Sequence, residues 1–392
     1  MLAPFPIPAP SIAPQTSQQP PRAHNTKMPA PTVTAQRAVE IKEKGVAVVS
    51  DTAPIPAVRD GYVLVKVTII ALNPTDWKHV DFEGLPGSRL GCDYAGVVIA
   101  TGDNLARKFK EGDRIAGFVH GANHNNKEDG AFAEYIVASA AVALHVPDDM
   151  SDEDAATLGV GVTTCGQGLF QSLKLPLPDT NEARDESRKE TLLIYGGSTA
   201  TGTLAIQFAK LAGWTVITTC SRKNFDLVRS RGADAVFDYK DADVGAQIRK
   251  HTNDKLAYVF DCISLESSAK VCAEAIGSAG GHYSALLGVE VDRPDVESRF
   301  TMAYTAFGEL FINLFGRDWP AKPEDVEFQI GFWSLVEWLL KEKKLMVHPV
   351  DVRPGGLEGA IDGMDRMRKG ELSGKKLVYR VAEKSRKIAL TL

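Results

Sequence analysis

The residues Leu192–Gly202 read LLIYGGSTATG, in which an apolar strand runs into a glycine-rich turn and then into the start of a helix. Such a turn can bind a dinucleotide, because the free N–H groups at the helix N-terminus can hold a pyrophosphate. The strict GxGxxG spacing is missing, so the turn alone is a weak signal, and a tight turn without a ligand is the alternative. Its glycines and hydroxyl residues are Gly196, Gly197, Ser198, Thr199, Thr201 and Gly202.

Around this turn, the residues from Thr191 to Leu287 alternate between short apolar runs and helical segments. This order predicts an α/β fold with a doubly wound parallel sheet of the Rossmann type, whose ligand lies at the carboxyl ends of the strands. The expected strands are Thr191–Tyr195, Thr215–Thr219, Ala235–Tyr239, Ala257–Cys262 and His282–Leu287. The expected helices are Ala200–Ala212, Phe225–Ser230, Val244–His251 and Leu265–Ile276.

The segments on either side of this domain have a different character. Gly61–Asn73 (GYVLVKVTIIALN) predicts a strand entering a core, and short β-type runs with recurring glycines follow it, which is typical of a distorted barrel or sandwich. Near the C-terminus, Phe332–Leu345 and Leu357–Lys369 predict helices and Lys376–Val381 predicts a closing strand. The polar segment Leu177–Glu190 is expected to be a surface loop.

These patterns divide the chain into four segments. The first is rich in proline and alanine, which predicts disordered chain, with a weak targeting role as the alternative. The expected segments are the leader 1–31, a β-rich substrate domain 32–176, the dinucleotide-binding domain 190–330 and a C-terminal tail 331–382.

Composition limits the possible partners and compartments. The 392 residues include 45 basic and 50 acidic side chains, a net charge of −5, so no nucleic-acid or anionic-membrane partner is expected. No apolar run reaches the roughly 18 residues that a membrane span needs. The five cysteines are scattered and never form a CxxC pair, which fits a reducing compartment and a cytoplasmic location.

The residues after the second expected strand indicate which dinucleotide binds. NAD sites usually place Asp or Glu there for the ribose 2′-hydroxyl. This chain instead has Ser221, Arg222, Lys223 and Asn224, and two cations with a hydroxyl suit the 2′-phosphate of NADPH. The alternatives are that the two cations are merely solvated and that Asn224 caps the next helix.

The chain resembles the medium-chain dehydrogenase/reductase family from about Thr32 to Val381. That resemblance implies a GroES-like domain, then a Rossmann domain, then a tail that returns to the first domain. The motifs that carry it are NPTDWK (Asn73–Lys78), GCDYAGVV (Gly91–Val98), EGDRIAG (Glu111–Gly117), GAFAEY (Gly130–Tyr135), VGVTT (Val160–Thr164) and GELSGKKLV (Gly370–Val378).

Zinc-dependent members of that family carry three metal ligands, and the matching positions here hold Thr75, Cys92 and Gly159. One thiolate cannot build a catalytic zinc site, which needs three protein ligands, so we expect no metal. His120 and His124 are expected to be solvated loop residues. Without a Lewis acid, the expected chemistry is hydride transfer to an activated alkene.

A finer resemblance is to the trans-acting enoyl reductases of fungal highly reducing polyketide synthases, such as the lovastatin-type enoyl reductase. It rests on NPTDWK, YGGSTATG, TCSRKNFDLVRSRGAD, VFDY, DCIS, GGHY and KGELSGKKLV. It implies a monomeric, NADPH-dependent enzyme of secondary metabolism that reduces an enoyl thioester on the acyl carrier domain of a partner synthase. The alternatives are a stand-alone quinone or enone oxidoreductase and a non-catalytic NADPH-binding partner protein.

The resemblance also implies positions for the site residues. The residues implied beside the nicotinamide are Thr75, Asp76, Trp77, Lys78, Leu286 and Leu287. Those implied at the pyrophosphate are Ser198, Thr199, Ala200 and Thr201, and those at the 2′-phosphate are Ser221, Arg222, Lys223 and Asn224. Tyr239 would lie near the adenine, and Val378 and Tyr379 would close the site from the tail.

Two of these side chains are candidates for catalysis. The Lys78 ammonium could stabilise an enolate or donate a proton, although a surface lysine fits the same sequence. Thr163 could line the substrate cleft or be a β-branched core residue. No conventional acid is evident, which leaves solvent as the proton source. A basic rim for an acidic carrier domain could come from Lys341, Lys343, Lys344, Lys375 and Lys376, although such lysines are usually just solvated.

Overall fold

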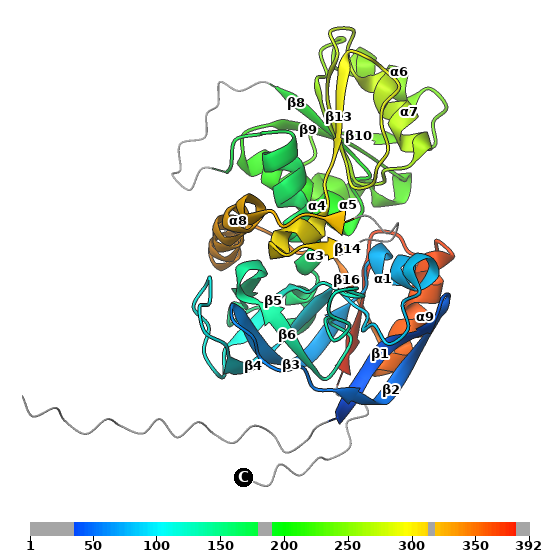
Figure 1. Cartoon of the computed structure of the whole chain (residues 1–392). Helices are drawn as coiled ribbons and strands as arrows, with labels where there is room; N and C mark the ends of the chain where they lie inside the picture. The colour runs from blue at the N-terminus through cyan, green and yellow to red at the C-terminus, as the bar shows by residue number, and fades with distance from the viewer. Residues whose placement is uncertain (1–34, 179–189, 313–317, 382–392) are drawn as a thin grey trace, which may run out of the picture. The chain divides into compact units, whose positions relative to one another are not determined.

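The computed structural model describes residues 35–178, 190–312 and 318–381 (Figure 1). The proline-rich leader and most of the expected loop Leu177–Glu190 lie outside the described residues. Within the described ranges the strands form a six-stranded sheet, a seven-stranded sheet and two two-stranded sheets. No helix in these ranges is both long and apolar enough to cross a membrane.

The six-stranded sheet is parallel throughout and is the expected Rossmann-type sheet. It confirms the predicted strands and adds an edge strand, β13, that the sequence analysis did not include. Its order is β10 (Ala235–Asp238), β9 (Thr215–Cys220), β8 (Thr191–Tyr195), β11 (Tyr258–Asp261), β12 (Gly281–Ala285) and β13 (Val296–Phe300). The helices between the strands are α4 (Ala200–Leu211), α5 (Phe225–Ser230), α6 (Val244–His251) and α7 (Glu266–Ala275).

Both faces of this sheet are covered, which explains the nearly continuous apolar runs of its strands. Successive side chains of a strand point to opposite faces. In β8, Leu192 and Ile194 accordingly pack in the core that contains α4, whereas Leu193 and Tyr195 pack in the core that contains α6 and α7. The carboxyl ends of the strands remain as the edge where a ligand can bind.

The seven-stranded sheet belongs to the β-rich domain and includes the C-terminal tail. β17 pairs antiparallel with β3, with Val378 opposite Ala71, so the tail returns to the N-terminal sheet as the resemblance implied. The order is β16 (Val350–Arg353), β17 (Lys376–Arg380), β3 (Tyr62–Ala71), β4 (Asp93–Thr101), β5 (Arg114–Phe118) and β7 (Ala143–His145), and β6 (Tyr135–Ser139) also pairs with β3. A separate pair, β1 (Ala35–Glu43) and β2 (Val46–Pro54), shares a core with α9 (Gly356–Arg368).

The α8 helix (Pro323–Lys341) begins well before the predicted start at Phe332 and ends before Leu345, so both predicted bounds were wrong. Proline in the first turn and the acidic residues Glu324 and Asp325 are ordinary helix-start signals, and they lie upstream of the apolar pattern. The shorter elements are α1 (Pro74–Lys78), η1 (His79–Glu83), η2 (Ala140–Val142), α2 (Asp152–Ala155), α3 (Gly159–Cys165), η3 (Gly166–Ser172), η4 (Arg222–Asn224), η5 (Ala303–Phe307), β14 (Phe311–Ile312) and β15 (Asp318–Trp319).

Candidate active site

The glycine-rich turn follows β8 and requires its two glycines. Gly196 has a φ of +83°, a conformation that side-chain-bearing residues rarely adopt. A Cβ atom on Gly197 would lie 2.0 Å from the Thr218 Oγ1 atom of the neighbouring strand β9. The backbone of the turn therefore packs directly against β9, leaving its outer side open to a ligand.

The helix α4 begins at the end of this turn. The Thr199 side chain caps it by accepting a hydrogen bond of 2.9 Å from the Gly202 N–H. Ser198, Thr199, Ala200 and Thr201 are half-buried there. The first N–H groups of a helix have no partner within the helix, and the positive end of its dipole favours anions. This end of α4 fits a pyrophosphate.

Three large apolar side chains lie exposed at the carboxyl edge of the sheet. Tyr239 follows β10, Ile263 follows β11 and Leu287 follows β12, with exposures of 46%, 37% and 39%. Apolar surface gathered at the ligand-binding edge of a parallel sheet suits the flat rings of a nucleotide. Ile263 was missed by the sequence analysis, although it lies in the quoted DCIS motif.

A buried hydrogen-bond network holds the loop after β11 in place. The Asp261 carboxylate is fully buried and accepts hydrogen bonds from the Ile263 and Ser264 N–H groups, each 2.9 Å long. The Ser264 hydroxyl in turn accepts a 2.7 Å bond from the N–H of Leu286, which is half-buried. These bonds fix the backbone positions of the two neighbouring loops at the ligand edge.

The expected 2′-phosphate group follows β9. The Arg222 guanidinium is exposed and forms ion pairs of 3.0 Å with Asp238 and 3.2 Å with Asp241, so it is held at the edge of the sheet, and Lys223 beside it is exposed. The Asn224 amide donates to the hydroxyls of Ser221, at 3.3 Å, and Ser373, at 2.9 Å.

The contact with Ser373 adds a residue that the sequence analysis missed. Ser373 belongs to the GELSGKKLV motif, which was used only to support the resemblance. The C-terminal tail therefore contacts Asn224, one of the four residues expected at the 2′-phosphate.

The helix α1 carries the residues expected beside the nicotinamide. Asp76 is fully buried, and its carboxylate accepts a 2.6 Å bond from the Asn73 N–H, which closes a capping box. Burial raises the Asp76 pKa to about 8. Asp76 thus orders the start of the helix, and its side chain is enclosed by protein.

Lys78 lies at the other end of α1 and is half-buried. Its ammonium is 5.9 Å from the centre of the Trp77 ring, and burial lowers its pKa. Within the described ranges it forms no ion pair with a carboxylate. A partly desolvated, uncompensated cation of this kind can bind a carbonyl or an enolate oxygen.

Besides Asp76, four further residues expected at the site or its rim lie in the protein core. The Thr163 side chain has no exposure and accepts a 3.2 Å hydrogen bond from the Trp333 indole, so it is a core residue in this structure and does not line a cleft. Val378 and Tyr379 are also buried, and the Tyr379 ring packs against the glycines of α9. Lys376 is not part of a basic rim, because its ammonium is buried and bonded to Asp93 and Asn73.

A cluster centred on Tyr304 was not anticipated. Its hydroxyl lies 2.9 Å from Thr75 Oγ1, 3.2 Å from His79 Nε2 and 3.6 Å from Cys92 Sγ. The His120 ring stacks on the Tyr304 ring at 4.2 Å. His120 is only 9% exposed, so its interpretation as a solvated loop residue was wrong. Burial lowers the pKa of His120 and lowers that of His79 to about 3, so both imidazoles are neutral at pH 7.

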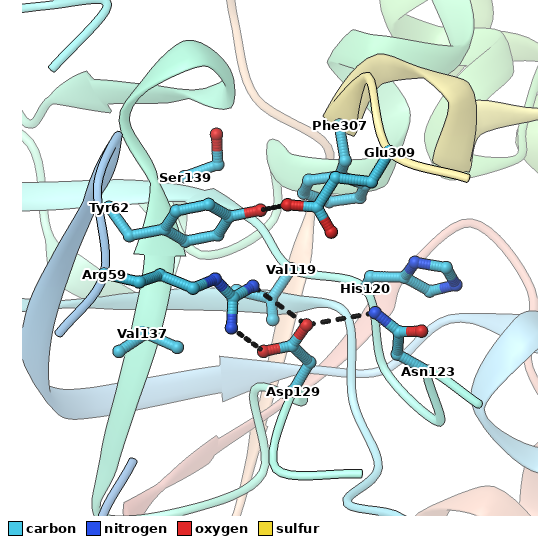
Figure 2. Close-up of a pocket in the computed structure, with 10 residues that line it drawn as sticks. All are labelled: Arg59, Tyr62, Val119, His120, Asn123, Asp129, Val137, Ser139, Phe307 and Glu309. Carbon is cyan, nitrogen blue, oxygen red and sulfur yellow. Dashed lines mark hydrogen bonds and ion pairs between the residues drawn. The ribbon is translucent and has the colours of Figure 1, made fainter. Parts of the chain in front are cut away.

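His120 also lines a small polar pocket, which therefore adjoins this cluster (Figure 2). In it, Arg59 forms an ion pair of 2.9 Å with the buried Asp129. The Tyr62 hydroxyl donates a 2.7 Å bond to Glu309, which ties the segment after η5 to the β-rich domain. The pocket residues are engaged with one another, and we interpret them as a support for the Tyr304 cluster.

The three positions that match metal ligands do not form a ligand set. Thr75 and Cys92 both contact the Tyr304 hydroxyl, and a Cβ on Gly159 would meet the Asp93 carboxylate at 2.3 Å. Across the described part of the chain, no three His, Cys, Asp or Glu side chains come together in a way that could hold a metal ion.

The helix α3 connects the cluster to the nucleotide edge. At one end, the Val160 N–H donates a 2.7 Å bond to Asp93, next to Cys92. At the other end, the Cys165 thiol contacts the carbonyl of Thr201 in the first turn of α4 at 3.4 Å. The two groups are thus linked through one short helix.

Comparisons with known proteins identify the family of the chain. A family model described as "Alcohol dehydrogenase GroES-like domain" matches residues 59–148, and one described as "Zinc-binding dehydrogenase" matches residues 200–319. The chain therefore belongs to the medium-chain dehydrogenase/reductase family.

Among its relatives is the trans-enoyl reductase resD of Aspergillus sclerotiorum, 44% identical over 356 residues, a match that covers 86% of this chain and 98% of that protein. The trans-enoyl reductase TOXD of Cochliobolus carbonum is 51% identical over 257 residues, covering 66% of this chain and 85% of that protein.

Solved structures share the fold at low sequence identity. An alcohol dehydrogenase superfamily protein from Novosphingobium aromaticivorans has a TM-score of 0.72 at 21% identity, covering 88% of this chain and all of that one. The CurK enoyl reductase has a TM-score of 0.69 at 17% identity, covering 88% and 99%. At these identities the likeness supports the fold.

Proposed function

We propose that this protein is an NADPH-dependent, trans-acting enoyl reductase. It reduces an α,β-unsaturated acyl thioester carried by the acyl carrier domain of a partner polyketide synthase, in secondary-metabolite biosynthesis. The observation that carries the proposal is the half-buried Lys78 on α1, whose ammonium forms no ion pair with a described carboxylate. On the same helix, Thr75 contacts the Tyr304 hydroxyl, as does Cys92, and these are two positions where zinc-dependent relatives have metal ligands. The similarity to trans-enoyl reductases over most of the chain supports the same reaction.

The nucleotide edge fits NADPH. The α4 N-terminus with Ser198, Thr199 and Thr201 would hold the pyrophosphate, and Arg222 with Lys223 would hold the 2′-phosphate. When bound, NADPH supplies the hydride that the β-carbon of the substrate receives. The choice of NADPH over NADH rests on these two cations and on the absence of an acid between Ser221 and Phe225.

The chain's own groups orient and polarise the substrate. As hydride adds to the β-carbon, negative charge develops on the thioester oxygen. Lys78 is placed to donate a charge-assisted hydrogen bond to that oxygen, and its partial burial strengthens the interaction. Because the Lys78 ammonium forms no ion pair with any described carboxylate, no salt bridge among these residues is broken when the substrate carbonyl enters.

Two supporting proposals concern the state of the protein. The five cysteines are all buried and free, which supports a cytoplasmic location. We also propose that the protein acts as a monomer that meets its synthase transiently. Size-exclusion chromatography with light scattering would test the oligomeric state.

The central experiment compares substrates. Purified protein is mixed with NADPH and either crotonyl-pantetheine or a simple quinone, and NADPH absorbance and product mass are followed. Thioester turnover with little quinone reduction is the expected result, and rapid quinone turnover with an inert thioester would identify a quinone oxidoreductase instead. No turnover of either substrate would favour a non-catalytic NADPH-binding protein.

A lysine variant then tests the role assigned to Lys78. Lys78→Ser should lower kcat/KM for the thioester by roughly 10- to 100-fold, as expected for the loss of one charge-assisted hydrogen bond, with little change in NADPH affinity. Lys42→Ser is the matched control, because Lys42 is exposed on β1. Equal rates for the two variants would remove Lys78 from the mechanism.

A further inference from the structure

The Tyr304 hydroxyl is the centre of a polar cluster built from three parts of the chain. It contacts Thr75 on α1, His79 at the start of η1 and Cys92 just before β4. Tyr304 itself belongs to η5, far along the sequence. No neighbour in the cluster is a carboxylate within hydrogen-bond distance of the hydroxyl, so nothing there removes its proton before substrate binds.

The phenol of Tyr304 is held neutral by its surroundings. The residue is half-buried, and desolvation by its surroundings raises its pKa well above the ordinary value. A phenol of this kind keeps its proton at physiological pH and can give it only to a strong base. An enolate is such a base.

The segment that carries Tyr304 is fixed at several points. The Thr305 side chain next to it accepts a 3.0 Å hydrogen bond from the buried Gln167 amide and donates to Asp325 of α8. The ring is clamped by the stacked His120 at 4.2 Å. After η5 in the sequence, Glu309 accepts a hydrogen bond from the Tyr62 hydroxyl, as Figure 2 shows. Such anchoring points the hydroxyl in one direction, as a positioned acid requires.

We infer that Tyr304 is the acid that protonates the substrate, a step that rests on the enoyl reductase function proposed above. When a hydride has formed the new C–H bond at the β-carbon, the electron pair of the C=C bond lies on the α-carbon and the thioester oxygen as an enolate. The Tyr304 O–H bond then breaks, its proton forms the C–H bond at the α-carbon, and its electron pair stays on the phenolate oxygen.

The neighbours of Tyr304 return the proton. The Thr75 hydroxyl lies 2.9 Å and the neutral His79 imidazole 3.2 Å from the phenolate oxygen, so each can donate a proton to it. The donor then takes up a proton from solvent. The cycle therefore consumes one hydride and one solvent proton for each alkene reduced. In this mechanism Lys78 stabilises the negative charge on the enolate oxygen, and Tyr304 protonates the α-carbon.

The test is Tyr304→Phe, assayed in D2O with NADPH and crotonyl-pantetheine. Removing the phenol while keeping the ring should lower kcat by roughly 100-fold or more, the usual size of a general-acid contribution. With NADPH deuterated at the transferred hydrogen, the wild type should give a single diastereomer of the α,β-dideuterated product by NMR, and the variant should give a mixture. NADPH affinity, measured by fluorescence titration, should be unchanged.

Tyr258→Phe is the matched control, because it removes the hydroxyl of another half-buried tyrosine, on β11, outside the Tyr304 cluster. It should keep both the rate, within about threefold, and the single α-configuration. Thr75→Val is a second variant, which removes one route of proton return and keeps the acid. It should slow steady-state turnover several-fold while the deuterium still enters one face.

Each outcome decides the matter. If Tyr304→Phe keeps a single α-configuration, whatever its rate, the proton comes from elsewhere and the assignment is wrong. If Tyr258→Phe gives the same mixture, the loss of the single configuration is not specific to Tyr304, and the assignment is again wrong. A wild type that does not reduce the thioester overturns the proposed function, and the acid assignment with it, which distinguishes that failure from the other two.

Discussion

The buried ammonium of Lys376 offers a direct test of how the C-terminal tail is joined to the β-rich domain. Its Nζ atom lies 2.5 Å from Asp93 Oδ2, 2.9 Å from Asn73 Oδ1 and 3.3 Å from the Thr157 carbonyl. The two charged side chains are 3% and 0% exposed. We predict that Lys376→Met strongly destabilises the fold.

The magnitude follows from what the substitution leaves behind. Removing one partner of a buried ion pair costs about 3–5 kcal/mol, because the other charge remains buried without compensation. Asp93 keeps one donor, the Val160 N–H at 2.7 Å, which favours the lower end of that range. Asn73 Oδ1 loses the hydrogen bond from Lys376, its one side-chain donor among the described residues, which adds about 1 kcal/mol. We therefore expect a loss of about 4 kcal/mol in the free energy of unfolding.

The assay is urea unfolding at pH 7 followed by tryptophan fluorescence. Lys375→Met is the matched control, because Lys375 is the exposed neighbour, and it should change the free energy by no more than about 0.5 kcal/mol. Adding Asp93→Asn to Lys376→Met should recover part of the loss, since no charge is then buried alone. A Lys376→Met protein as stable as the Lys375→Met protein would refute the reasoning.

Three further predictions concern the cofactor and pH. Arg222→Ser should weaken NADPH binding by roughly 10-fold or more and leave NADH binding nearly unchanged, measured by fluorescence titration. Gly197→Ala should also weaken NADPH binding at least 10-fold, because its Cβ would collide with Thr218 at 2.0 Å; unchanged affinity would contradict this geometry. Burial lowers the His348 pKa to about 3, so below pH 6.5 the unfolded state binds the extra proton and stability falls as pH falls. The loss from this group should be on the order of 1 kcal/mol between pH 7.5 and 5.5, and His348→Asn should remove it from the pH dependence of urea unfolding.

The nucleotide-binding half of the fold could be predicted from the sequence because its signals are local. A strand such as β8 or a helix such as α6 is determined by apolar periodicity within a few residues, and both have the predicted bounds. The order of the sheet follows from strands alternating with helices. The edge strand β13 has little apolar pattern, since only Val296 of its five residues is buried, and it was not predicted.

The candidate site was harder to predict because its contacts are distant in sequence. Tyr304 and Thr75 are 229 positions apart, and no pattern around either residue indicates the other. The burial of Lys376 could not be predicted, because it follows the exposed Lys375 and its partner Asp93 is distant in sequence. His120 looked like a loop histidine because its aromatic neighbours come from η5 and β14.

The Tyr304 cluster also explains why this fold can favour alkenes over carbonyls. At the matching positions, zinc-dependent relatives hold ligands for a metal that polarises oxygen, whereas Thr75 and Cys92 here contact a neutral phenol. A phenol adds little positive charge to a carbonyl, so direct hydride transfer to an isolated ketone gains little from it. It does carry a proton, which an enolate needs after hydride has reached the β-carbon. The substitution of a proton donor for metal ligands is thus suited to the second half of an alkene reduction, and the role proposed above for Lys78 belongs to the first half.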